Sequence, residues 1–103
     1  MASKSPKTDS VTSKPTRKFK TGDVSITRNA LTRIGFDESF KALVRHVSGD
    51  WGELCDDDRR ANELALKDGS RLLSVYWTET DVKFYIITEA DRSYTTVLLP
   101  EDY

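Results

Sequence analysis

The last third of this 103-residue chain alternates apolar and polar side chains with a period of two, and this pattern constrains its fold most strongly. Three segments carry the pattern, and they are rich in the β-branched and aromatic residues that strands favour. The alternating positions are Leu73, Val75 and Trp77, then Val82, Phe84 and Ile86, then Thr95, Val97 and Leu99, and all but Thr95 are apolar. Short polar links at 78–81 and 89–93 predict two hairpins between the segments. Pro100 ends the last strand because it has no N–H to donate.

The middle of the chain predicts a short strand followed by helices. Residues 23–27 alternate polar and apolar side chains, as a strand does. A first helix is expected to begin after Thr27 as its N-cap and to end at Gly35. A second helix, capped by Asp37, repeats apolar residues at helical spacing until Gly49 ends it.

A third helix is expected at about residues 57–68, within and after an acidic run. Carboxylates suit the positive end of a helix dipole, and Gly69 can close the helix. The predicted order is therefore β-α-α-α-β-β-β, an α+β fold with an antiparallel sheet and the helices packed on one face. The strands carry apolar residues on both faces, so the second face is expected to be covered by another segment or to contact a partner.

The formal net charge of −1 combines two segments of opposite sign. Residues 1–22 hold six Lys and Arg against Asp9 alone, a net charge of +5, whereas residues 23–103 hold 10 basic and 16 acidic residues, a net charge of −6. The first segment has few apolar side chains and cannot bury enough surface to offset its chain entropy. We therefore expect a disordered basic tail over 1–22 and a single α+β domain over 23–103. The tail either contacts phosphate groups or an acidic partner, or it only adds solubility.

Composition excludes several classes of protein. No apolar run approaches the roughly 18 residues that span a bilayer, and the first 22 residues lack the apolar core of a secretory signal. We therefore expect a cytoplasmic protein without membrane contact. Cys55 is the only cysteine and His46 the only histidine, and the acidic run at 56–58 lacks the spacing of a calcium loop. We expect no metal and no cofactor.

One set of side chains points to acid–base chemistry. His46 lies beside the apolar positions of the second predicted helix, where it is either a general base or a histidine at the edge of the core. In a ribonuclease interpretation, Arg92 would hold the phosphate, and Thr95 or Thr96 would orient the reacting group.

Two turns are candidates for partner binding. Asp50 and Trp51 lie between two glycines, so Trp51 either fills the core from a loop or presents an aromatic anchor. Glu89, Asp91 and Arg92 lie at the tip of the second hairpin. Arg92 either binds a carboxylate or phosphate there, or the turn satisfies its own polar groups.

Three stretches stand out together: RHVSGDWGEL at 45–54, IITEADRS at 86–93 and TTVLLPEDY at 95–103. They resemble a family of small, largely uncharacterised proteins carried by bacterial plasmids, prophages and other integrative elements. The resemblance spans about residues 24–103 and excludes the basic tail. It implies an accessory protein of a mobile element and transfers no chemistry to particular residues.

Three functions follow as hypotheses. The first is a non-enzymatic module that binds a protein complex of the host or of the element and inhibits or modulates host defence, using exposed aromatic residues such as Tyr85, Tyr94 and Tyr103. The second is a small endoribonuclease, because RelE/ParE-type toxins have a similar order of a strand, helices and three antiparallel strands. The third is a nucleic-acid-associated regulator that uses the basic tail.

Overall fold

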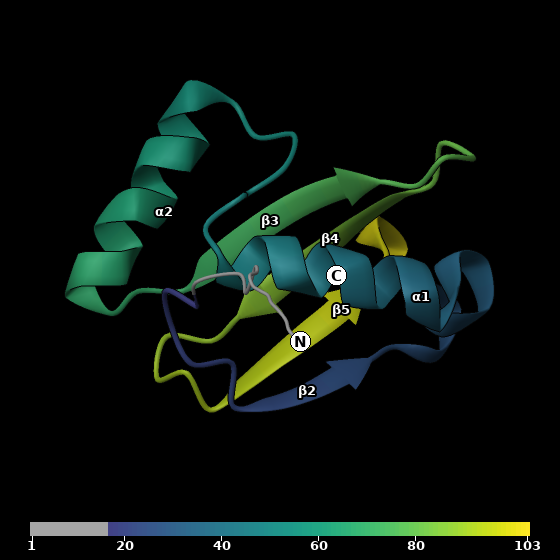
Figure 1. Ribbon diagram of the computed structural model, residues 1–103, viewed down its shortest axis with the longest axis horizontal. Helices are drawn as coiled ribbons and strands as arrows, with labels where there is room; N and C mark the ends of the chain where they lie inside the picture. The colour runs from purple at the N-terminus through teal and green to yellow at the C-terminus, as the bar shows by residue number, and fades with distance from the viewer. Residues whose placement is uncertain (1–16) are drawn as a thin grey trace, which may run out of the picture.

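The computed structural model of the protein describes residues 17–103 and contains a four-stranded sheet with two α-helices (Figure 1). The elements are β2 (Asp23–Ile26), α1 (Arg28–Val47), α2 (Asp56–Asp68), β3 (Leu72–Trp77), β4 (Lys83–Thr88), β5 (Tyr94–Leu98) and a short 3-10 helix, η1 (Pro100–Asp102). The α+β class predicted from the sequence is confirmed. The part of the predicted tail at 1–16 lies outside the described residues.

Helix α1 covers the stretch where the sequence predicts two helices. Thr27 is its N-cap and accepts a hydrogen bond from the N–H of Ala30 (3.1 Å). Gly35 interrupts the helix with φ 81° and ψ 169°, a conformation that glycine adopts readily. The helix resumes directly afterwards, and Ser39 Oγ donates to the carbonyl of Gly35 (2.8 Å) across the break. The predicted helix end at Gly35 is therefore a kink inside α1 and not a boundary between two separate helices.

Helix α2 begins in the acidic run and ends at Gly69, as the sequence predicts. Three aspartates form its first turn, where they face the positive end of the helix dipole. Gly69 is left-handed, with φ 81° and ψ 23°, and its N–H donates to the carbonyl of Ala65 (2.9 Å). Within residues 17–103, neither helix is long and apolar enough to cross a membrane.

The sheet has the strand order β2-β5-β4-β3 and is mixed. β3, β4 and β5 are antiparallel hairpin neighbours, as predicted. β2 lies parallel to β5, with Asp23 opposite Tyr94, which corrects the expectation of a purely antiparallel sheet. Most of the chain separates these two strands, and a connection of that length permits either direction. The alternating pattern of a strand identifies its buried side chains but says nothing about the direction of its neighbour.

Both helices lie on the same side of the sheet. α1 crosses one face (Figure 1), and α2 packs beside β3. The main core, beneath α1, consists of Ala30, Ile34, Ala42, Tyr76, Phe84, Ile86, Val97 and Leu99. A second cluster joins Trp51 and Ala65 to Leu72, which lies on the same face of β3 as Tyr76. Neither helix covers the opposite face.

The segment 17–22, which the sequence assigns to the tail, runs along the domain. The N–H of Lys18 donates to the carbonyl of Val47 (2.7 Å), and the carbonyl of Thr21 accepts from Thr95 Oγ1 (2.8 Å). Phe19 is half-buried and packs against the second cluster. A single phenylalanine in a polar, basic stretch is too weak a signal to predict burial. The predicted domain boundary at residue 23 therefore leaves out the segment 17–22, which packs against the domain.

Candidate functional site

His46 lies within a buried chain of hydrogen bonds beneath α1. Its Nδ1 is 2.6 Å from Ser74 Oγ, and its Nε2 is 2.9 Å from Thr88 Oγ1. Thr88 Oγ1 is 2.7 Å from Thr95 Oγ1, which donates to the carbonyl of Thr21 (2.8 Å). The side chains of all four hydrogen-bonded residues, His46, Ser74, Thr88 and Thr95, are fully buried. The structure thus joins His46 to Thr95 through Thr88, while Ser74 occupies the other ring nitrogen. The sequence analysis did not single out Ser74 or Thr88.

The direction of these hydrogen bonds fixes the state of the imidazole. Because Thr95 uses its hydroxyl proton toward Thr21, Thr88 must donate to Thr95. Thr88 then accepts from Nε2–H of His46, and Nδ1 accepts from the hydroxyl of Ser74. The network is satisfied by a neutral imidazole that carries its proton on Nε2.

Aromatic rings close the network from outside. The rings of Phe19 and Trp51 meet His46 edge-on, with centroids at 5.1 and 5.7 Å, and the two rings stack at 6.1 Å. Burial lowers the pKa of His46 to about 3, and the positive charge of Arg92 contributes in the same direction. Both ring nitrogens are occupied, so this histidine has no free position from which to act as a general base.

Arg92 binds backbone carbonyls. Its Nη1 donates to the carbonyls of Ser70 (2.7 Å) and Glu89 (3.1 Å), and its Nη2 donates to that of Ala65 (3.0 Å). Ala65 belongs to the last turns of α2, so the guanidinium also faces the negative end of that helix. Arg92 therefore links the second hairpin to α2, and its donors are used within the fold.

Thr95 and Thr96 point to opposite faces of β5. Thr95 belongs to the buried network, whereas Thr96 lies opposite Ile87 on the face away from the helices. The four residues of the ribonuclease interpretation thus do not converge: His46 and Thr95 are sealed, Arg92 holds carbonyls, and Thr96 lies across the sheet.

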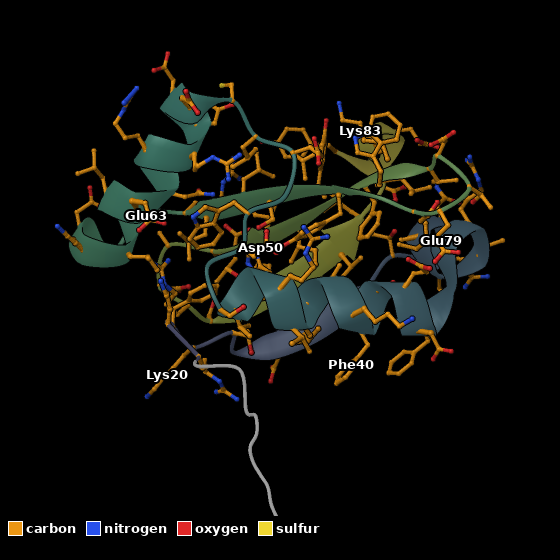
Figure 2. All side chains as sticks on the ribbon, turned by 45° about the horizontal axis from the view of Figure 1, so that its top comes forward. Lys20, Phe40, Asp50, Glu63, Glu79 and Lys83 are labelled. Carbon is orange, nitrogen blue, oxygen red and sulfur yellow. The ribbon has the colours of Figure 1, made fainter. Side chains whose placement is uncertain are left out.

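The turn at Gly49–Gly52 is braced by charge and filled by an aromatic ring. Arg45 binds both carboxylate oxygens of Asp50 (2.7 and 3.2 Å), and this hydrogen bonding lowers the pKa of Asp50. Trp51 is 1% exposed and donates Nε1–H to Glu63 of α2 (2.7 Å). Figure 2 labels Asp50 in this turn and Glu63 on α2. Trp51 therefore fills the core, and only Asp50 of the pair reaches solvent.

The same turn closes the outer edge of β3. A Cβ at Gly52 would lie 1.9 Å from the carbonyl oxygen of Val75, so the close approach requires glycine. The backbone of the turn exchanges two hydrogen bonds with Val75 (2.8 and 3.1 Å). From α2, Asn62 donates to the carbonyl of Leu73 (2.6 Å) and accepts from its N–H (3.2 Å). These contacts occupy the outward backbone groups of Leu73 and Val75, which a further strand would need.

The tip of the second hairpin is a satisfied turn with an exposed rim. Asp91 accepts from the N–H of Ser93 (2.9 Å), and hydrogen bonds from Ser93 lower the pKa of Asp91. Glu89 is half-buried, and its carbonyl accepts from the N–H of Arg92 (2.9 Å). A shallow hollow of about 340 Å³ follows this rim as far as Tyr94. Asp91 is exposed and accessible to a partner, whereas the guanidinium of Arg92 is engaged.

The face of the sheet away from the helices carries an aromatic surface, which we call the open face. Its residues are Asp23, Ser25, Arg71, Leu73, Val75, Trp77, Lys83, Tyr85, Ile87, Tyr94, Thr96, Leu98 and Tyr103. Val75, Ile87 and Leu98 are buried among the larger side chains. Trp77, Tyr94 and Tyr103 are 50%, 48% and 71% exposed. The ring of Tyr103 meets that of Tyr85 edge-on at 6.1 Å, and its hydroxyl accepts from Arg71 (2.8 Å). The apolar residues on both faces of the predicted strands were the signal of this surface.

Comparisons with protein-family models, with curated proteins and with solved structures gave no match to this chain. Its function is therefore inferred from the side chains themselves.

Proposed function

We propose that this protein is a non-enzymatic binding module, an accessory protein of a mobile element that docks through its open face onto a protein of the host or of the element and modulates a defence complex. The proposal depends on one observation, that the helices cover only one face of the sheet. The helices occupy one face, while the other presents Trp77, Tyr94 and Tyr103 to solvent. Exposed aromatic side chains gathered on one face of a protein mark a candidate interaction site.

The composition of the open face suits a protein interface. Tyrosine, tryptophan and arginine contribute most of the binding energy at such interfaces. The guanidinium of Arg71 lies 5.9 Å from the ring centroid of Tyr103, and Nζ of Lys83 lies 5.8 Å from that of Tyr85. These contacts order the side chains before a partner arrives, so less side-chain entropy is lost on docking.

The charge of the open face indicates the chemistry of its partner. Arg71 and Lys83 are its basic residues, and Asp23 of β2, opposite Tyr94, is an acidic residue at its edge. The domain at 23–103 has a net charge of −6. A partner surface with an apolar centre and carboxylates at its rim would complement this face.

The alternatives receive less support from the geometry. A ribonuclease needs an accessible base, and His46 is sealed and hydrogen-bonded through both nitrogens. A nucleic-acid regulator would depend on the basic tail, whose residues 1–16 lie outside the described part of the chain. Under our proposal, deletion of residues 1–16 leaves partner capture intact.

Site-specific photo-crosslinking tests the proposal. A photoreactive phenylalanine analogue is placed at Tyr94 on the open face or at Leu64, an exposed residue of α2 that serves as control. In native host cells, we expect a discrete protein adduct from position 94 and none of that mass from position 64. Adducts from both positions, or from position 64 alone, would place the interface elsewhere.

Matched variants connect the adduct to the aromatic side chains. Trp77→Ala combined with Tyr103→Ala should abolish the adduct from position 94, because both rings are exposed on the open face. Leu64→Ala should leave it unchanged. Circular dichroism of the purified variants checks that each is folded. Full retention of the adduct in a folded double variant would contradict the proposal.

A further inference from the structure

The two edges of the sheet differ in how they are protected. The edge at β3 is closed at Val75 by the turn backbone and at Leu73 by Asn62. At β2, the N–H groups of Asp23 and Thr27 donate toward β5 (3.0 Å each). The N–H and C=O groups of successive residues in a strand point to opposite edges, so those of Val24 and Ile26 point to the outer edge. Among residues 17–103, no hydrogen bond outside the ladder reaches them.

An apolar patch lies beside this open edge. Phe36 and Phe40 of α1 stack at 6.0 Å and are 61% and 54% exposed, and Val24 of β2 is 44% exposed. Together with Ile26 and Leu43 they line a hollow of about 270 Å³ between α1 and β2. Figure 2 shows Phe40 pointing outward from α1. An unpaired strand flanked by exposed rings is a surface that pairs with another chain.

We propose that this edge is a homodimer interface, in which β2 pairs antiparallel with β2 of a second copy and the phenylalanines of both α1 helices pack above the joined strands. The interface is separate from the open face, so the proposal does not depend on the proposed function. Two features of the patch, its dimensions and its charges, identify the partner as a second copy.

The distance between the two α1 helices in such a dimer explains why the phenylalanines are exposed in one copy. α1 packs on β4, β5 and β2, so it lies over β5, the middle of these strands. Pairing two sheets through β2 separates the two β5 strands by three strand spacings, about 14 Å. Helices in direct contact lie only about 8–10 Å apart. The remaining space between the two α1 helices is filled if Phe36 and Phe40 project from each copy.

The charges beside the patch suit a two-fold axis. Asp37 and Lys41 are exposed, lie one helical turn apart on α1 and flank Phe40 in the sequence. Within residues 17–103, neither forms a salt bridge. In an antiparallel pair of helices, Asp37 of one copy faces Lys41 of the other, and the contact occurs twice. A partner of another sequence would not require this reciprocity.

Sedimentation equilibrium of the full chain tests the proposal. We expect a reversible rise from the mass of one chain to twice that mass as concentration increases. Phe40→Glu should abolish the dimer, because it places a charge at the centre of the interface. Val24→Pro should also abolish it, because it removes an N–H that points to the outer edge. Leu64→Glu, on the exposed surface of α2, should leave the dimer intact.

Charge exchange gives a test that does not depend on apolar surface. Asp37→Lys alone should weaken the dimer by about tenfold, and adding Lys41→Asp should restore it. A protein that remains monomeric at all concentrations overturns the proposal. So does a dimer that survives Phe40→Glu, or one that Trp77→Ala abolishes, since Trp77 belongs to the open face.

Discussion

His46 makes the stability of this small domain depend on pH. Its imidazole is neutral in the folded protein, where burial lowers its pKa to about 3 from an ordinary value of 6.5. Between these two pH values, the unfolded chain binds a proton that the folded protein does not. The contribution of His46 is therefore fully present above pH 6.5 and is lost as the pH falls toward 3.

The first prediction concerns the stability that the folded protein loses as the pH falls. The free energy of unfolding should fall by up to about 1.4 kcal/mol per pH unit below pH 6.5, the limit for one proton. Urea denaturation at a series of pH values measures it. The lowered pKa values of Asp50, Asp91 and Asp102 place their titration below 3.8, so the interval from about 6.5 to 4.5 reports mainly on His46.

His46→Gln serves as the control for this titration. Glutamine keeps one donor and one acceptor but does not titrate. The variant should be less stable overall and should show a flatter dependence on pH over the same interval. Equal slopes in the two proteins would show that another group carries the effect.

At the scale of the elements, the sequence predicts the strands and helix ends whose signals lie within a few neighbouring residues. The period-two segments became β3, β4 and β5, and Thr27 and Gly69 delimit helices as their chemistry suggests. Gly35 breaks its helix as predicted, but a glycine can turn the chain within one residue, so no loop follows. The parallel direction of β2 depends on a strand about 70 residues away, and no local signal encodes it.

The candidate site was less predictable than the helices and strands, because its contacts also join residues that are far apart in the sequence. The sequence presents Arg92 as a free charge, yet all four of its side-chain acceptors are backbone carbonyls. The fold brings two of them, those of Ala65 and Ser70, from distant parts of the chain. His46 reads as a possible base, and only the assembled sheet brings Ser74 and Thr88 to its two nitrogens. Hydrogen-bond partners far apart in the sequence decide whether such a side chain is available for chemistry.

The second prediction concerns the closed edge of β3. Asn62 is buried and makes both side-chain hydrogen bonds to Leu73 (2.6 and 3.2 Å). Asn62→Ala leaves that N–H and carbonyl without their partner, which should lower the free energy of unfolding by about 2 kcal/mol. Amide hydrogen exchange at Leu73 should also accelerate. Leu64→Ala, two residues further along α2 and exposed, should change neither measurement. Unchanged exchange at Leu73 in Asn62→Ala would contradict the role given to the side chain.

At the scale of the whole molecule, the segment 17–22 ties the layers together. It bonds to the end of α1 through Lys18 and to β5 through Thr21. Phe19 lies between these contacts, against the rings of His46 and Trp51, and the guanidinium of Arg92 is 5.9 Å from its centroid. The burial of the histidine network therefore depends on a segment outside the predicted domain boundary.

The third prediction follows from that dependence. Phe19→Ala should admit water to the network and raise the pKa of His46 from about 3 toward 6.5, because desolvation is the main cause of the shift. Titration of the imidazole signals by NMR measures this change. The free energy of unfolding should fall by about 2 kcal/mol, less than for a fully buried phenylalanine. Phe40→Ala, an exposed ring on α1, should leave the pKa of His46 unchanged. If the pKa stays near 3 in a folded Phe19→Ala variant, Trp51 and the helix layer alone exclude water, and the segment 17–22 is only an attachment.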